Sequence, residues 1–191
     1  VNDIDFNKLP SKCVLKTNHG SGDAIIYEKG KSDITKIRKQ LAKDLKRNYA
    51  KASLEYHYKD IKPLIICEEF LDDKKNKVPL DYKFSCFNGK PIYVGVYADR
   101  GEHLKRIFYD MKWVKQDILV KDDNCDLAKP KNFDKMIEIA TLLADSKKFV
   151  RVDLYNIDGK IYFGELTYTP ASGCYKCFTK EALNEMGNLI K

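Results

Sequence analysis

Two short dipeptides, Asn88-Gly89 and Asp158-Gly159, constrain the fold of this chain more than any other feature. Each separates two runs rich in β-branched and aromatic residues, and this pattern is the strongest short-range signal for a β-hairpin. The pattern predicts strands at 82–87 and 91–97 and, further on, at 149–155 and 160–166. Tight hairpins join antiparallel neighbours, so antiparallel sheet is expected in the second half of the chain.

The first quarter of the chain predicts another hairpin, followed by a helix. Residues 13–17 and 24–27 are mostly apolar and flank the loop NHGSGD, whose small and polar residues favour a turn. Apolar residues then recur at helical spacing from 34 to 45, after Ser32 and Asp33, either of which can cap the first turn. A loop of small residues is therefore expected between two strands near the start of the chain.

The remaining patterns add strands and helices further along. The run PLIICEEFL at 63–71 is continuously apolar until it closes on two carboxylates, which predicts a buried strand that leads to a site. Other patterns predict a polar connection at 72–79, a strand near 106–109, a helix at 133–144 and a short helix capped by Thr179. The chain contains no internal repeat.

Length and composition limit the classes of protein. With 191 residues and 43% hydrophobic content, the chain can bury a core as one domain or as two small lobes. No apolar run approaches the roughly 20 residues that cross a bilayer, and VNDIDFNKLP lacks signal-peptide features, so we expect a cytoplasmic protein without membrane insertion. The net charge of +7 is compatible with a polyanionic ligand. Nucleic acid is not the expected partner, because no arginine-rich helix or interleaved aromatic pattern stands out.

The six cysteines are expected to be reduced thiols, because most lie in apolar, strand-like runs where cysteine behaves as a small hydrophobe. Cys174 and Cys177 form a lone CxxC, with no second pair or nearby histidine to complete a four-ligand zinc set. A metal at this pair is therefore the less favoured interpretation.

The hairpin around Asp158-Gly159 gathers acidic and basic side chains. Arg151 and Asp153 alternate with apolar residues, so they point to one face of their strand. A three-residue loop at 157–159 would place Glu165 opposite Arg151 on that face, whereas a two-residue turn would point Glu165 to the other face. Two carboxylates with open positions suit Mg²⁺. The alternative, slightly favoured by this segment alone, is a surface ion pair between Arg151 and Glu165.

The loop NHGSGD suggests a phosphate site. Lys16 precedes the glycines and a second strand follows them, so this is not a Walker A motif. The arrangement is closer to the glycine-rich loop of kinases, where a hairpin covers the phosphates and a strand lysine neutralises them. Gly20 and Gly22 let backbone N–H groups approach a polyphosphate, while a hairpin without a ligand is the simpler alternative. Glu68, near the end of the apolar run, could accept a hydrogen bond from an exocyclic amine.

The order of these elements resembles the ATP-grasp superfamily. The segment RVDLYNIDGKIYFGELTYTPASG looks like the metal-binding segment of D-alanine:D-alanine ligases. Together with LPSKCVLKTNHGSG, LDYKFSCFNGKP and IFYDMKW, it resembles the TupA-like ATP-grasp family, which is associated with bacterial cell-surface polysaccharide and teichuronopeptide synthesis. The resemblance implies an α+β ATP-grasp fold, in which two lobes with antiparallel sheets, here 1–71 and 72–191, grip ATP between them.

The resemblance also implies which residues bind ATP. Lys16 would contact the α- and β-phosphates, and Glu68 would face the adenine amino group. The other residues implied in ATP binding are Gly20, Ser21 and Gly22 as a flap over the triphosphate, Glu69 and Leu71 through their backbone, Phe70, and Lys83.

The implied chemistry is the activation of a carboxylate. Asp153, Glu165 and Thr167 would hold Mg²⁺, and Arg151 would be the catalytic residue that stabilises the phosphorylated acid or its oxyanion. ATP would convert the acid into an acyl phosphate, which an amine then attacks with release of ADP and phosphate. The implied partners are ATP and an acidic substrate, either a polysaccharide or an amino acid.

Two features depart from the family pattern. Thr167 stands where the family has a metal-ligating asparagine, and the chain starts only fifteen residues before Lys16, so an N-terminal region is expected to be missing. These departures keep two alternatives open, a non-catalytic nucleotide-binding module and a glycosyltransferase-pathway protein. Further candidate contacts for phosphate or acid are Lys83, Arg100, Arg106 and Lys112, although a solvated sheet residue is the favoured interpretation of any single one of them.

Overall fold

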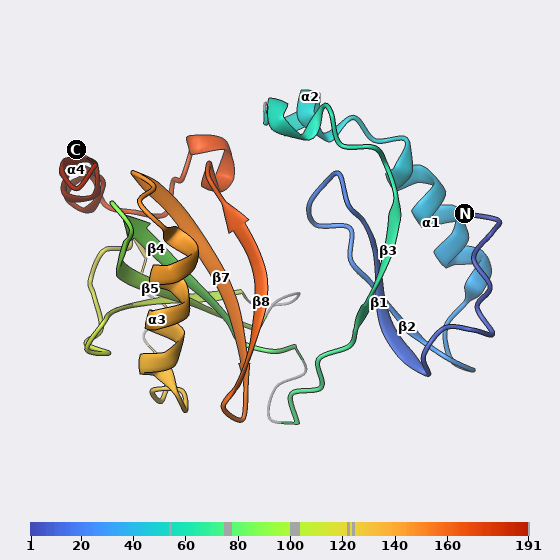
Figure 1. Ribbon diagram of the computed structural model, residues 1–191, viewed down its shortest axis with the longest axis horizontal. Helices are drawn as coiled ribbons and strands as arrows, with labels where there is room; N and C mark the ends of the chain where they lie inside the picture. The colour runs from blue at the N-terminus through green and yellow to red at the C-terminus, as the bar shows by residue number, and fades with distance from the viewer. Residues whose placement is uncertain (54, 75–77, 100–103, 122, 124, 191) are drawn as a thin grey trace. The chain divides into compact units, whose positions relative to one another are not determined.

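A computed structural model of the chain describes residues 1–53, 55–74, 78–99, 104–121, 123 and 125–190. The chain divides into two compact units, Val1–Leu71 and Asp72–Lys191. Each unit combines an antiparallel sheet with helices, which confirms the α+β class (Figure 1). No helix of the described residues has the length and apolarity needed to cross a membrane.

The first unit is built on a three-stranded antiparallel sheet with the order β2-β1-β3. Leu15 and Tyr27 of the sheet pack against Leu41 of helix α1, and together they form the centre of this unit's core. The side chain of Asp33 accepts a hydrogen bond from the backbone nitrogen of Lys36, which confirms the predicted cap. The elements are β1 (Lys12–Thr17), β2 (Ile25–Glu28), α1 (Ile34–Leu45), α2 (Tyr49–Ser53), the 3₁₀ turn η1 (Tyr56–Tyr58) and β3 (Ile65–Glu69).

The apolar run at 63–71 contains a strand, as predicted, but the prediction that this strand is buried is wrong. Strand β3 lies at the edge of the sheet and pairs only with β1 among the described strands. Its last three residues, Cys67, Glu68 and Glu69, are exposed. An apolar run predicts a strand but not the number of its neighbours, and β3 has a neighbour on one side only.

The second unit is built on a five-stranded antiparallel sheet with the order β6-β5-β4-β7-β8. Helix α3 lies across one face of this sheet (Figure 1), and every residue of β4 is buried. The predicted helix cap is confirmed, because the Thr179 hydroxyl accepts a hydrogen bond from the backbone nitrogen of Ala182. The elements are β4 (Asp81–Phe87), β5 (Lys90–Ala98), β6 (Lys105–Asp110), α3 (Phe133–Ala144), β7 (Phe149–Ile157), β8 (Lys160–Thr167), the 3₁₀ turn η2 (Pro170–Gly173) and α4 (Lys180–Asn188).

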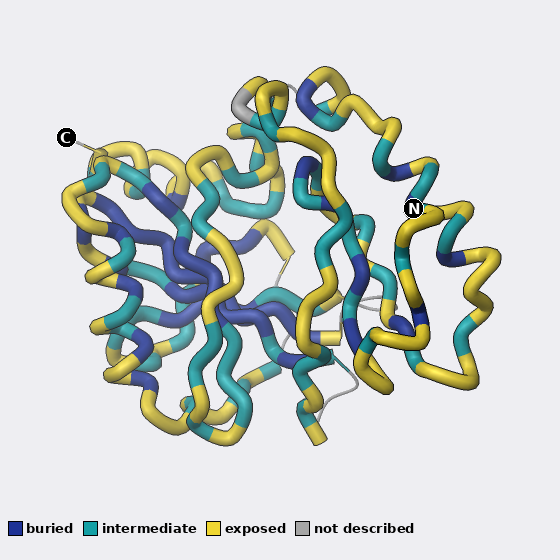
Figure 2. The backbone as a smooth tube through the Cα atoms, turned by 45° about the vertical axis from the view of Figure 1, so that its right-hand side comes forward, coloured by how far each residue is buried: buried dark blue, intermediate teal, exposed yellow. Residues whose placement is uncertain are grey.

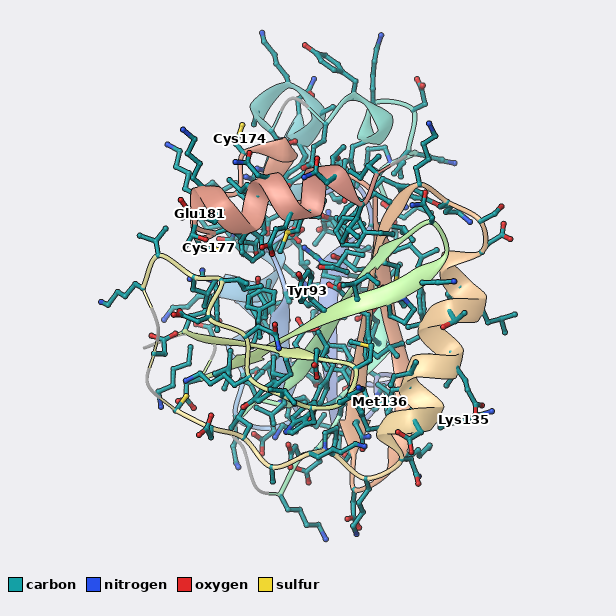
Figure 3. All side chains as sticks on the ribbon, turned by 90° about the vertical axis from the view of Figure 1, so that its left-hand side faces the viewer. Tyr93, Lys135, Met136, Cys174, Cys177 and Glu181 are labelled. Atoms are coloured by element: carbon teal, nitrogen blue, oxygen red, sulfur yellow. The ribbon has the colours of Figure 1, made fainter. Side chains whose placement is uncertain are left out.

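The two faces of this sheet differ in chemistry. Toward α3 the strands present apolar residues such as Phe84 and Val152, which belong to the same core cluster as Met136. Met136 of α3 points toward the sheet while Lys135 points away from it (Figure 3). Burial is therefore concentrated along the strands that α3 covers (Figure 2). The opposite face carries the alternate residues of β4 and β7, which include the charged side chains described below.

Both predicted Asx-Gly hairpins have two-residue turns. Asn88 and Gly89 have φ of 49° and 76°, and Asp158 and Gly159 have φ of 50° and 94°, as a type I′ turn requires. Of the two turns that the sequence left open at 157–159, the structure has the two-residue one, because Ile157 pairs directly with Lys160.

The register changes again further along this hairpin. A β-bulge beside Asp153 leaves Gly164 as an extra residue, so that Glu165 pairs with Asp153 and Thr167 with Arg151. With a two-residue turn and no bulge, Glu165 would point to the other face of the strand. The bulge shifts the register by one residue, so Glu165 lies on the same face as Asp153. A side chain at position 164 would be crowded, because an added Cβ would lie 3.0 Å from the carbonyl oxygen of Asp153.

We expect Gly89→Ala to lower the free energy of unfolding by about 2 kcal/mol, because the left-handed conformation is strained for alanine. An added Cβ would also collide with the backbone oxygen of Asp145. Gly187→Ala in α4 is the matched control, because nothing lies within 4 Å of an added Cβ there. The control should gain about 0.5–1 kcal/mol from helix propensity. Urea unfolding measures both variants, and equal stabilities would contradict the expectation.

Candidate functional site

The candidate site in the second unit begins with the register of β4 and β7. Lys83 pairs with Asp153, and Ser85 pairs with Arg151, so these four residues share one face of the sheet. The face is the one turned away from α3. Charged residues side by side on two inner strands are unusual in a sheet that has only a structural role, because burying a charge costs free energy unless the charge is paired.

Lys83 is buried rather than solvated, which contradicts the interpretation of single lysines in this region as solvated sheet residues. Its side chain is 9% exposed, and its ammonium group forms ion pairs with Asp81, at 2.7 Å, and with Asp153. Sequence reasoning did not single out Asp81, which is 1% exposed. The alternation of Asp81 and Lys83 on one strand was the available signal, since residues two apart share a face.

Arg151 joins Asp153 to Glu165. Its Nε donates to Asp153 at 2.6 Å, and its Nη2 donates to Asp153 at 2.7 Å and to Glu165 at 3.0 Å. Burial acts to lower the pKa of the guanidinium, but the hydrogen bond and charge of Asp153, with the charge of Glu165, outweigh it and raise the pKa. Arg151 therefore stays protonated and holds both carboxylates in place.

Thr167 positions Glu165. Its hydroxyl donates to the Oε1 atom of Glu165 at 2.8 Å and accepts a hydrogen bond from Nη2 of Arg151 at 3.0 Å. The Oε2 atom of Glu165 has no hydrogen bond or ion pair to any described residue, and the Glu165 side chain is 56% exposed. This carboxylate is thus both oriented by the protein and open to an incoming ligand.

The donor set fits a divalent cation that also binds phosphate. Three carboxylates, Asp81, Asp153 and Glu165, face two cations, Lys83 and Arg151, which leaves a net negative charge on the cluster. Within the described residues, however, no group of three or more His, Cys, Asp or Glu side chains could hold a metal alone. A magnesium ion here would therefore need water and substrate phosphates as further ligands, which is its usual preference.

Lys16 and Glu68 meet in the first unit. Lys16 pairs with Ile66 in the ladder while Glu68 lies two residues further along β3, so both side chains lie on the same face of the sheet. Their ammonium and carboxylate groups form an ion pair at 2.8 Å, with 34% and 46% of the side chains exposed. An exposed pair of this kind is worth about 0.2–1 kcal/mol, so a ligand can separate it at little cost.

The loop that carries Gly20, Ser21 and Gly22 has a fixed base and an open tip. Thr17 donates from its backbone nitrogen and its hydroxyl to Asp23, which ties the two ends of the loop together. Ser21 and Gly22 are exposed, and Gly22 has φ of 84° with no atom within 4 Å of an added Cβ. The tip can therefore approach a ligand with backbone N–H groups.

The end of β3 supplies the other predicted contacts of the first unit. Glu69 is exposed, and Phe70 and Leu71 are half-buried. The ammonium of Lys12 lies 3.8 Å above the ring of Phe70, which holds that ring at the edge of the sheet. The backbone of this edge strand faces no described strand on its outer side, so it is free to pair with a flat heterocycle.

Of the remaining predicted cations, Arg106 is the one that the described residues place in the same hollow as Arg151. Arg100 lies outside the described residues, and Lys112 is exposed in the turn after β6. Arg106 lies with its guanidinium 5.7 Å from the ring of Tyr97. Cys174 and Cys177 are free thiols, and burial raises the pKa of Cys177, which keeps that thiol protonated.

Comparison with known proteins gives one match over the whole sequence. The family model described as TupA-like ATPgrasp matches residues 1–191. No curated protein matches the sequence.

One solved structure shares the fold at low sequence identity, and two others are less similar. A D-alanine--D-alanine ligase from Bacillus anthracis, complexed with ATP, is 15% identical with a TM-score of 0.53, and the match covers 98% of this chain and 55% of that one. A D-alanine–D-alanine ligase from Helicobacter pylori is 13% identical with a TM-score of 0.46, covering 99% and 51%. The ATP-grasp ligase PsnB, complexed with its minimal precursor, is 11% identical with a TM-score of 0.45, covering 94% and 48%. The chain thus spans about half the length of these proteins.

Proposed function

The chain belongs to the TupA-like ATP-grasp family, and from this premise we propose that it is an ATP-dependent carboxylate ligase. The observation that carries the proposal is the charged cluster on one sheet face, where Arg151 holds Asp153 and Glu165 side by side. We also propose that the two compact units are the two lobes that bind ATP. A cytoplasmic role in the synthesis of a cell-surface polymer is the finer part of this proposal, supported by the family membership and by the free thiols of the cysteines.

The proposed reaction has two steps. A carboxylate oxygen of the substrate attacks the γ-phosphorus of ATP, the bond from that phosphorus to the bridging oxygen breaks, and ADP leaves. An amine then attacks the acyl carbon, the bond from carbon to the phosphate oxygen breaks, phosphate leaves, and the amine nitrogen loses a proton. In the first step negative charge moves from the acid oxygen to the leaving oxygen of ADP, and in the second it develops on the acyl oxygen and the leaving phosphate. Fixed cations and positioned ligands can therefore supply most of the catalysis.

The residues of the chain take distinct roles in these steps. Lys16 exchanges its partner Glu68 for the α- and β-phosphates, and Glu68 is then free to accept from the adenine amine. Asp153 and Glu165 would hold Mg²⁺, which when bound neutralises phosphate charge. Arg151 keeps both carboxylates aligned and stabilises the negative charge that develops on the acid. Thr167 acts as a positioning residue for Glu165, and its role as a direct metal ligand stays a prediction.

A turnover assay tests the proposed function. The chain is incubated with ATP and Mg²⁺, and ADP release is followed as acids are added one by one, with and without an amine. A ligase should release ADP only in the presence of a suitable acid. ATP binding without ADP release for any acid would favour the second candidate, a non-catalytic nucleotide-binding module. That candidate is supported by Thr167, whose hydroxyl is already engaged by Arg151 and Glu165.

We expect Lys16→Ala to weaken ATP binding at least tenfold, about 1.4 kcal/mol, because the variant loses the cation assigned to the phosphates. Lys8→Ala is the matched control, since Lys8 is an 85% exposed lysine of the same unit and its loss changes the net charge equally. Isothermal titration of both variants measures the difference. An equal loss in the two variants would mean that only the overall charge attracts ATP.

A further inference from the structure

The second unit contains a cavity of about 300 Å³ to which the proposed function assigns no ligand. It lies between the sheet face that carries Arg151 and the segment 170–190, which includes η2 and α4. Its volume is at the lower end of the range for small-molecule sites, which suits a ligand the size of an amino acid or an aryl acid. All of its lining residues belong to the second unit.

The lining changes from charged to apolar along the strands. On β4 and β7 the pair Ser85 and Arg151 is followed by the pair Phe87 and Phe149, whose ring centroids lie 5.2 Å apart. Residues two apart on a strand are separated by about 6.6–6.8 Å along the strand. The aromatic pair and Arg151 are therefore close enough for one small ligand to contact both. The next pair in the opposite direction is Lys83 and Asp153, part of the cluster assigned to phosphate and metal. A ligand in this cavity would therefore have one end beside the proposed reaction centre.

The other wall of the cavity is apolar too. Leu183, Met186 and Ile190 recur at helical spacing, so one face of the carboxy-terminal segment lines the cavity. Leu183 is 45% exposed and Ile190 is 46% exposed, although both are large apolar residues. Gly187 lies on the same face, and nothing lies within 4 Å of an added Cβ there. This face of the helix is thus only partly covered by protein.

The polar end of the cavity suits a carboxylate. Arg151 uses Nε and Nη2 for Asp153 and Glu165, whereas its Nη1 has no hydrogen bond or ion pair to any described residue. Tyr175 lines the same end and its hydroxyl bonds that of Tyr97. A second hollow, which shares Arg151 and Tyr175 with the cavity, adds Arg106 and Lys176. Arg106 and Lys176 therefore add two cations next to the end of the cavity that Arg151 lines.

We propose that this cavity binds the acid substrate by an aromatic or branched aliphatic body, with the carboxylate held at Nη1 of Arg151. The assignment rests on the proposed function, because it makes the bound carboxylate the one that ATP activates. It adds a substrate class, since a highly polar acid would leave hydroxyl or charged groups without partners among Phe87, Phe149 and Met186. Selection then comes from the apolar chamber, while the cationic end only orients the acid.

A binding experiment with probe compounds and two helix variants tests the assignment. The probes are 3-phenylpropionate, the more polar acid glutarate, and 3-phenylpropan-1-ol, which has the same apolar body without the carboxylate. Gly187→Leu should fill the cavity, while Asn184→Leu adds the same side chain at an exposed position of α4 outside the lining. Thermal unfolding of both variants checks that each is folded. Dissociation constants are measured by isothermal titration, and the magnesium-dependent affinity for ATP is measured on the same samples.

We expect 3-phenylpropionate to bind at least tenfold more tightly than either glutarate or the alcohol. Its affinity should fall at least tenfold in Gly187→Leu and stay unchanged in Asn184→Leu, with ATP affinity equal in both. If ATP binds but 3-phenylpropionate binds no better than glutarate, or binds Gly187→Leu as well as the unmodified chain, this inference is overturned while the proposed function stands. If ATP does not bind, the proposed function fails, and with it the assignment of the cavity to a substrate.

Discussion

Replacing Asp153 with alanine is expected to lower the free energy of unfolding by about 3 kcal/mol and to abolish magnesium-dependent binding of ATP. Asp153 is 3% exposed at its side chain and is shared by two cations, Lys83 and Arg151. Breaking a buried ion pair from one side typically costs about 3–5 kcal/mol, because it leaves an uncompensated charge. The lower end of that range applies, because in the variant Lys83 still forms its ion pair with Asp81 and Arg151 still forms its ion pair with Glu165. Urea unfolding measures the stability and isothermal titration measures the binding.

A second substitution separates charge from packing in this result. Asp153→Asn keeps nearly the same side-chain shape but lacks the charge, so it should lose about as much stability as Asp153→Ala, because Lys83 and Arg151 again lose an anionic partner. Magnesium-dependent ATP binding should be lost as well, because the proposed carboxylate ligand of the metal is again absent. A cost below about 1 kcal/mol for Asp153→Ala would mean that the cluster is solvated and works as a surface ion pair.

The second large effect is expected for Glu165→Gln, which should leave the fold intact while weakening magnesium-dependent ATP binding at least tenfold, about 1.4 kcal/mol. The side chain is 56% exposed, so its ion pair with Arg151 contributes little to stability. Glutamine has nearly the same shape and can still accept the hydrogen bond from Thr167. The loss of ATP affinity is therefore assigned to the missing negative charge of Glu165, which a bound cation would need. ADP release with a suitable acid should fall further, about a hundredfold, since charge stabilisation also acts in the transition state.

The control for this variant is Glu138→Gln on α3. Glu138 is also an exposed glutamate of the second unit with a basic partner, Lys135, at 2.7 Å. The control should bind ATP like the unmodified chain in magnesium. The comparison is repeated in EDTA, where Glu165→Gln and the unmodified chain should bind equally weakly. A tenfold loss that persists in EDTA would show that Glu165 contacts the nucleotide directly and not through a cation.

Much of the secondary structure could be predicted from local signals in the sequence. The Asn88-Gly89 and Asp158-Gly159 turns, the Asp33 cap and the apolar spacing of 133–144 each depend on residues close in sequence. Turn conformation and helix capping are fixed by such neighbours, so these predictions are confirmed. The family resemblance, which rested on several ordered segments, is confirmed over the whole chain.

The details of the candidate site depended on partners far away in sequence. The burial of Lys83 follows from its pairing with Asp153, seventy residues later, and no local pattern reveals such a contact. The side of the hairpin on which Glu165 lies follows from the bulge at Gly164, which offsets the two-residue turn. The exposure of β3 follows from its place at the edge of the sheet. The cavity beside Arg151 is lined by a helix whose packing position the sequence alone does not define.

We propose that Lys16, Asp153 and Glu165 bind the same magnesium-bound triphosphate, and a crystal structure with a nonhydrolysable ATP analogue and magnesium is the decisive experiment. We expect a metal ion with oxygens of Asp153 and Glu165 at about 2.0–2.1 Å, and the ammonium of Lys16 within hydrogen-bond distance of a phosphate. A triphosphate bound away from Arg151, or a metal ion held by the phosphates without either carboxylate, would show that these residues do not form the ATP site.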